Sequence, residues 1–157
     1  MRTIAFGCVL IALANFFLSG AARAEPQIEI SNAWARATPG ASSIGAAYLQ
    51  VANTGDAPDR LVSVTSFVAR AAELHATIQD GDIMRMHKID AVEIAPGAAV
   101  AFKPNGMHIM LVDLKGPLRQ GNSFALTLTF AESGTTTVEV TVQPAGASGM
   151  EMPAHRH

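Results

Sequence analysis

The stretch SFALTLTFAESGTTTVEVTV, residues 123–142, shows most clearly how this chain folds. Its second half alternates apolar and polar residues along much of its length, which is typical of a β-strand with one face in water. Ser133-Gly134 separates the two halves, and glycine adopts the positive φ angle that a tight turn needs. We therefore predict strands at Ser123–Phe130 and Thr135–Val142.

The same pattern extends back to Gln27. Short runs of β-branched and apolar residues are separated by turn residues, and no long stretch has the periodicity of an amphipathic helix. This indicates an all-β sandwich or barrel. The segment from Ala69 to Leu74 could instead form a helical turn. The other predicted strands are Gln27–Ser31, Ala46–Ala52, Arg60–Val68, Ala72–Ile78, Ile83–Lys88, Ala99–Lys103 and His108–Leu111.

The size and charge of the chain exclude several classes of protein. Its 157 residues are enough for one domain, and a hydrophobic content of 49% is enough for a core. The formal net charge is -2 and only 15% of the residues are charged. A nucleic-acid partner is not expected, because it would require a basic surface.

Residues 1–24 have the pattern of a secretory signal peptide. Arg2 gives a basic start, an apolar run continues to Leu18, and Ala22-Arg23-Ala24 has the Ala-x-Ala form of a cleavage site. A membrane anchor is the alternative, but the apolar run of about fifteen residues is shorter than the roughly 20 that a spanning helix needs. We expect cleavage after Ala24 and export of a folded domain of residues 25–143.

Cys8 is the only cysteine, and it lies within the predicted signal peptide. The mature protein would then have no thiol, which excludes disulfides, thiol nucleophiles and thiolate zinc sites. It also excludes a blue-copper electron-transfer centre, which requires a cysteine ligand. The folded domain must rely on its hydrophobic core.

The methionines and histidines are clustered in the sequence. Apart from Met1, every methionine lies in one of three short stretches, and every histidine except His75 lies in or beside the same stretches. Methionine used as ordinary core filler would be scattered. The clusters are Met84, Met86 and His87; Met107, His108 and Met110; and Met150, Met152, His155 and His157.

A hairpin with its turn at Asp80-Gly81 would bring His75 to the first cluster. With a two-residue turn His75 lies opposite Met86, and opposed side chains are close enough to share a metal ion. A three-residue loop would instead place His87 opposite His75, because a slip of one residue moves a strand's side chains to the other face.

His108 and Met110 are two residues apart on one predicted strand, so they share a face. Two histidines and two methionines can thus converge from three strands. Soft thioethers and borderline imidazoles select copper, particularly Cu(I), over hard cations, and four neutral ligands favour handing the ion on over storing it. Met84 and Met107 are predicted to lie in the core or at the rim, and His87 at the surface.

The spacing of these residues resembles the copper-site pattern of the PCu(A)C family of periplasmic copper chaperones. Ten residues separate His75 from Met86, twenty-one separate Met86 from His108, and one separates His108 from Met110. Ala76 stands where some members have a further methionine, which is not one of the four ligands. The similar segments lie between Ile28 and Val142 and include Ala33–Arg36, Gly45–Tyr48, Asp80–Met86 and Asp113–Leu118.

The resemblance implies a cupredoxin-like (Ig-like) β-sandwich that binds Cu(I) through His75, Met86, His108 and Met110. It also implies a protein of the bacterial periplasm that supplies copper to the binuclear centre of cytochrome c oxidase, sometimes beside a thiol-containing chaperone. We expect a monomer. An enzyme is disfavoured, because the sequence shows no acid–base or nucleophile arrangement.

Residues 144–157 are predicted to form a flexible tail with a second group of donors, Met150, Met152, His155 and His157. Imidazoles suit Cu(II), so the tail could take up oxidised copper or bridge to the core site, or it could be a solvated end without either role. The tail slightly favours an alternative function, a copper-buffering or resistance protein with no dedicated acceptor. In a plain Ig-like interaction module the clustering would be accidental.

Overall fold

The computed structural model describes residues 24–149, in which the chain forms ten β-strands and no helix. The predicted all-β fold is confirmed, and the segment from residue 69 to residue 74 is strand. One short strand was not predicted, because its three residues are too few to show an alternation. The strands are β1 (Ile28–Arg36), β2 (Ile44–Asn53), β3 (Asp59–Thr65), β4 (Ala69–Asp80), β5 (Ile83–Lys88), β6 (Val92–Ile94), β7 (Ala99–Phe102), β8 (His108–Leu114), β9 (Ser123–Phe130) and β10 (Gly134–Gln143).

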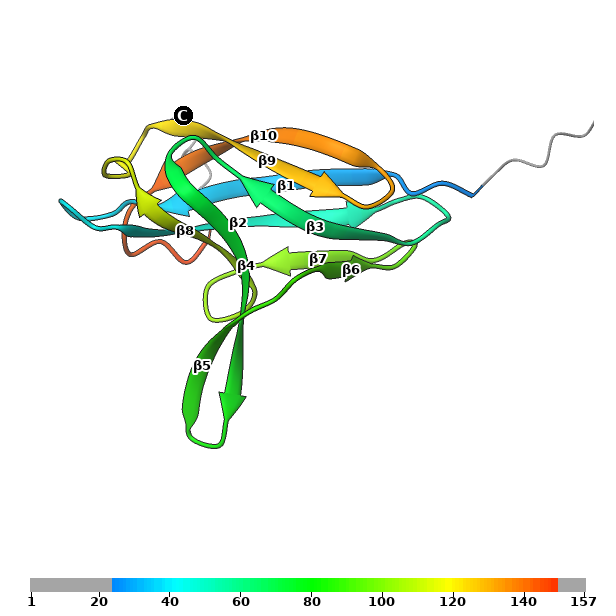
Figure 1. Cartoon of the computed structure of the whole chain (residues 1–157), viewed down its shortest axis with the longest axis horizontal. Helices are drawn as coiled ribbons and strands as arrows, with labels where there is room; N and C mark the ends of the chain where they lie inside the picture. The colour runs from blue at the N-terminus through cyan, green and yellow to red at the C-terminus, as the bar shows by residue number, and fades with distance from the viewer. Residues whose placement is uncertain (1–23, 150–157) are drawn as a thin grey trace, which may run out of the picture.

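The strands form one hydrogen-bonded sheet that folds over into a β-sandwich (Figure 1). Their order is β5-β4-β8-β2-β1-β10-β9-β3-β6, and β7 pairs with β2. Only β1 and β10 run parallel; the other paired strands are antiparallel. Within residues 24–149 there is no helix long and apolar enough to cross a membrane.

The hairpin of β9 and β10 shows how the alternation builds the core. Leu126 and Leu128 of β9 and Val140 of β10 are completely buried. Thr127 of β9 and Thr137 of β10 face outward instead, and their hydroxyl oxygens lie 3.0 Å apart across the two strands. The apolar face of this hairpin therefore enters the core, as the alternation in residues 123–142 predicts.

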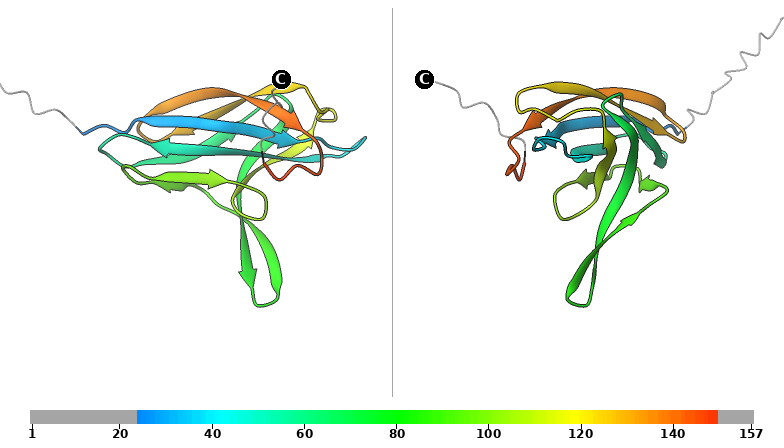
Figure 2. Two further views of the ribbon diagram at one scale, coloured as in Figure 1. Left: turned by 180° about the vertical axis from the view of Figure 1, so that it is seen from behind. Right: turned by 60° about the vertical axis from the view of Figure 1, so that its left-hand side comes forward.

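β4 and β5 extend away from the body of the sandwich as a long hairpin (Figure 2). The first part of β4, up to His75, pairs with β8, whereas the residues beyond it pair with β5. We term residues 76–87 the β4–β5 arm. Every residue of β5 is exposed to solvent, so the arm is held by its backbone hydrogen bonds more than by burial.

The chain that follows β10 turns back onto the sheet. Ala147 is buried against Trp34 and Tyr48, whose ring centroids lie 4.5 Å apart, and its carbonyl accepts a hydrogen bond of 2.9 Å from Arg36 Nε. The prediction that the tail does not pack is therefore wrong at Ala147, because a methyl side chain fits against the two rings. The tail donors Met150, Met152, His155 and His157, and residues 1–23 of the predicted signal peptide, lie outside the described residues.

Asp59 ties the start of β3 to the turn between β9 and β10. Its buried carboxylate accepts hydrogen bonds from the backbone N–H groups of Glu132, at 2.9 Å, and Ser133, at 3.0 Å. Burial by itself raises the pKa of Asp59, but hydrogen bonds from the Ser133 side chain and from three backbone N–H groups outweigh it, so the pKa is lowered.

Replacing Asp59 with asparagine is expected to cost about 2 kcal/mol of stability at neutral pH, because an amide N–H would face a backbone N–H. A lowered folded-state pKa stabilises the fold at pH values above the unfolded pKa of about 3.9. That contribution is lost as the pH falls through the folded-state value. In urea denaturation, the difference between wild type and Asp59→Asn should therefore shrink on acidification. A difference that stays constant with pH would contradict this account.

Candidate metal centre

The two predicted histidine ligands lie directly opposite each other on neighbouring strands. His75 of β4 pairs with His108 of β8, and their ring centroids are 5.9 Å apart with an interplanar angle of 33°. Metal–imidazole bonds are about 2.0–2.1 Å long, so rings at this separation can each direct a nitrogen at one ion. This juxtaposition joins residues 33 positions apart in the sequence.

The predicted pairing of His75 with Met86 is wrong, and so is the alternative with His87. His75 lies opposite Lys88, and Met86 lies opposite Thr77. The loop consists of Gly81 and Asp82, with Gly81 at φ +62°, so the turn begins one residue later than predicted. The pairing shifts by two residues, and an even shift keeps Met86 on the face of His75.

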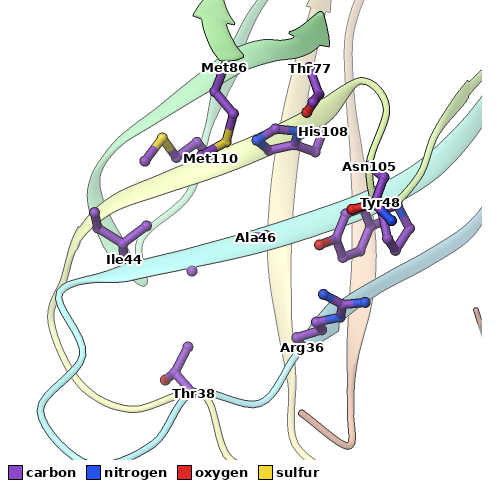
Figure 3. Close-up of a pocket in the computed structure, with 12 residues that line it drawn as sticks. Arg36, Thr38, Ile44, Ala46, Tyr48, Thr77, Met86, Asn105, His108 and Met110 are labelled. Carbon is purple, nitrogen blue, oxygen red and sulfur yellow. The ribbon is translucent and has the colours of Figure 1, made fainter. Parts of the chain in front are cut away.

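Met86 and Met110 meet His108 in one cleft of about 350 Å³. Figure 3 shows Met86 reaching from the β4–β5 arm toward Met110 and His108 on β8. Met110 is part-buried and pairs with Glu73 in the β4–β8 register. Two thioethers and an imidazole thus share one opening, with the second imidazole beside them.

Hydrogen bonds determine which nitrogen of His108 is available. His108 Nδ1 lies 3.0 Å from the carbonyl oxygen of Gly106. A carbonyl only accepts hydrogen bonds, so Nδ1 carries the proton and Nε2 keeps its lone pair. The same carbonyl accepts the N–H of Thr77 at 3.3 Å, which links the arm to the loop before β8.

His75 is oriented by a carboxylate. Its Nε2 lies 3.0 Å from Glu73 Oε2, and the other oxygen of Glu73 accepts a 2.9 Å hydrogen bond from Lys88 Nζ. The hydrogen bonds from His75 and Lys88 lower the pKa of Glu73, so the carboxylate is ionised and accepts the Nε2 proton. The other ring nitrogen, Nδ1, is buried and has no hydrogen-bond partner within residues 24–149.

A histidine that binds a metal ion is neutral, and one ring nitrogen has a free lone pair for the ion. The other ring nitrogen usually donates its N–H to a carboxylate or carbonyl. His75 Nδ1 and His108 Nε2 both meet this condition. The residues present therefore fit a soft metal ion with two imidazole and two thioether ligands.

Sequence reasoning did not identify Glu73 as the partner of His75. The spacing of Glu73 and His75 could have indicated this partner, because residues two apart on a strand share a face.

Sequence reasoning also did not identify Arg36 and Tyr48, which line the cleft on the side away from the arm. The Arg36 guanidinium lies 5.8 Å from the ring centroid of Tyr48, and burial raises the pKa of Tyr48, an effect that the charge of Arg36 partly offsets.

The remaining clustered residues have different surroundings. Met107 is part-buried against the hydrophobic core, as predicted. His87 is exposed and pairs with Ala76, on the opposite face of the arm from Met86. Met84 lies neither in the core nor at its rim: its side chain is exposed on the arm.

Comparison with known proteins assigns the family. The family described as "Putative lipoprotein LpqE-like" matches residues 28–142. The chain belongs to the LpqE-like family. A relative described as a putative lipoprotein of Leifsonia xyli subsp. xyli is 33% identical over 117 residues, which is 74% of this chain and 69% of the relative.

Solved structures of PCuAC domains share the fold of this LpqE-like protein, and the resemblance to the PCu(A)C family is confirmed. The copper-bound PCuAC domain from PmoF2 has a TM-score of 0.66 and 29% sequence identity, covering 78% of this chain and 97% of that one. The solution structure of CuI-DR1885 from Deinococcus radiodurans has a TM-score of 0.59 and 30% identity, covering 78% and 81%. The predicted cupredoxin-like β-sandwich is thereby confirmed.

Proposed function

We propose that this LpqE-like protein is a copper chaperone that binds one Cu(I) ion through His75 Nδ1, His108 Nε2 and the thioether sulfurs of Met86 and Met110. The observation that carries the proposal is the orientation of the two imidazoles. His75 donates its Nε2–H to the Glu73 carboxylate, and His108 donates its Nδ1–H to the Gly106 carbonyl, so each ring keeps one free nitrogen. His108 lines one cleft with the thioethers of Met86 and Met110, and His75 pairs with His108. Two imidazoles and two thioethers are a donor set that suits Cu(I).

The comparisons support the choice of metal. The PCuAC domain from PmoF2 is copper-bound, and DR1885 is described with Cu(I). The neutral ligands leave the positive charge of Cu(I) uncompensated, which favours release to an acceptor over storage. Met86 stands on the exposed arm, so one ligand can move away without disturbing the core.

We further propose that the protein is exported to the bacterial periplasm after cleavage of residues 1–24, where it acts as a monomer and not as an enzyme. The acceptor would be the binuclear copper centre of cytochrome c oxidase, alone or together with a thiol-containing chaperone. The relative from Leifsonia xyli, described as a putative lipoprotein, supports export.

A competitive Cu(I) titration of residues 25–157 under anaerobic reducing conditions tests the function. We expect one tight equivalent per chain, because the proposed site has four donors for a single ion. The measurement is the Cu(I) taken from a chromogenic chelator of known affinity. Absence of tight binding would contradict the proposal.

Transfer from the loaded protein to an apo copper-site domain of the oxidase would separate delivery from the alternative, copper buffering without a dedicated acceptor.

The tail donors Met150, Met152, His155 and His157 would provide a separate site for Cu(II). Deleting residues 149–157 is expected to leave the Cu(I) equivalent in place and to lower Cu(II) uptake, because imidazoles bind the oxidised ion better than thioethers do. The Cu(II) stoichiometry of the full mature chain and of the truncated chain, measured by titration, checks this. An unchanged Cu(II) stoichiometry would contradict the role of the tail.

A further inference from the structure

Met84 lies on the exposed β4–β5 arm, where a methionine that only fills the core would not be expected. Its side chain is 55% exposed, close to the 61% of Met86. It lies opposite Gln79 near the tip of the β4–β5 arm, whereas Met86 lies opposite Thr77 nearer the base. Burial therefore gives no reason for a methionine at this position.

Met84 is on the face of the arm that carries the candidate site. Residues two apart on a strand point to the same side, so Met84 shares a face with Met86 and, across the hairpin, with Thr77. Met86 and Thr77 both line the cleft. The opposite face of the arm carries Ile78 and Ile83, which are exposed as well.

The two methionines of the arm are close enough to hold one ion. Their Cα atoms are separated by two residues of extended strand, roughly 6.6–6.8 Å. Methionine has three rotatable bonds and a polarisable sulfur, so both sulfurs can turn toward a point between them. Thioethers bind Cu(I) and need no deprotonation.

We propose that Met84 and Met86 form an outer Cu(I) position through which the ion enters and leaves the four-ligand site. This inference rests on the proposed copper function. On release, the bonds from the ion to His75, His108 and Met110 break as bonds to the Met84 sulfur and to a donor atom of the acceptor form. The bonds to Met84 and Met86 then break as further donor atoms of the acceptor bind the ion. The ion remains Cu(I) throughout, and no electron or proton is transferred.

The geometry explains why the outer position would be useful. His75 and His108 lie at the base of the arm and are largely buried, so an acceptor has less access to them than to the exposed arm. Met84 is accessible and further out along the same face. A ligand there keeps the ion coordinated while its bonds to the buried imidazoles are exchanged.

The test measures transfer rate and equilibrium affinity separately. Cu(I)-loaded wild type and Met84→Leu are mixed with excess bicinchoninate, a chromogenic Cu(I) chelator, and the release rate is followed by stopped flow. Leucine keeps the apolar bulk and removes the sulfur. We expect release to slow by about tenfold, equivalent to about 1.4 kcal/mol in the barrier. The equilibrium Cu(I) affinity should change by no more than about threefold, because the four inner ligands are intact.

Two further variants make the result specific. Ile78→Leu, on the opposite face of the arm, should release copper at the wild-type rate. Met84→Leu/Gln79→Met returns a thioether to the same level of the arm on the neighbouring strand, and should recover most of the lost rate.

A wild-type release rate in Met84→Leu would overturn the outer position. So would faster release together with weaker equilibrium binding, since Met84 would then be a ligand of the inner site. Failure of wild type to bind Cu(I) would instead overturn the proposed function.

Discussion

Replacing His108 with alanine is expected to lower the Cu(I) affinity by at least about 100-fold, since loss of a partner that merely orients a ligand already costs 10–100-fold. The variant removes the imidazole of His108, whose Nδ1–H donates to the Gly106 carbonyl and whose Nε2 is left free. Competitive titration against a chromogenic Cu(I) chelator measures the loss. Far-UV circular dichroism reports whether the β-sandwich persists.

Two companion variants separate loss of a ligand from loss of structure. His87→Ala removes an exposed imidazole from the opposite face of the arm and should leave Cu(I) affinity within about twofold of wild type. Met110→Leu keeps the volume of a part-buried side chain, removes its sulfur, and should weaken Cu(I) binding without affecting folding. Full affinity in folded His108→Ala and Met110→Leu would refute the ligand assignment.

Replacing Asn53 with alanine is expected to destabilise the fold by about 3–4 kcal/mol, because it removes one buried and three part-buried hydrogen bonds to backbone groups. Asn53 is 1% exposed at the end of β2. Its Oδ1 accepts the N–H groups of Gln27 and Gly55, at 3.1 and 3.0 Å. Its Nδ2 donates to the carbonyls of Ala57 and Ile94, at 2.7 and 3.2 Å. One amide thereby connects the start of β1, the loop after β2, and β6.

The measurement is thermal and urea unfolding of wild type and Asn53→Ala, with a fall in Tm of about 10–15 °C expected for a domain of this size. Asn122→Ala is the matched control. Asn122 is exposed, and its side chain makes no hydrogen bond within the described residues, so its loss should cost less than about 0.5 kcal/mol. Equal stability of the two variants would contradict the role assigned to Asn53.

Most of the strands could be predicted, because alternation and turn residues are local properties. β5 and β9 have the predicted bounds. β1 is longer than predicted because the chain continues past a register shift between Ser31 and Trp34, where Asn32 adopts a φ of +53°. Asparagine tolerates this conformation, but nothing in the alternation marks the position.

The residue types of the candidate centre could also be proposed from the sequence, because their spacing and their soft, neutral chemistry are visible there. Their partners in space could not. The hairpin register differed from the prediction by two residues, and Glu73 became evident as the partner of His75 only from their 3.0 Å contact. The docking of Ala147 against Trp34 and Tyr48 was likewise not visible in a short polar segment.

The sequence by itself determined the class of the fold, the strand positions, and the residue types that point to a soft metal, since each depends on neighbours within a few positions. The tertiary structure decided that His75 faces His108, that Met86 and Met84 share the face of the arm that overhangs the cleft, and which ring nitrogens are free. These depend on strand register and on hydrogen bonds between distant segments. Register is selected by the combined pairing and packing of the whole sheet, which no local pattern specifies.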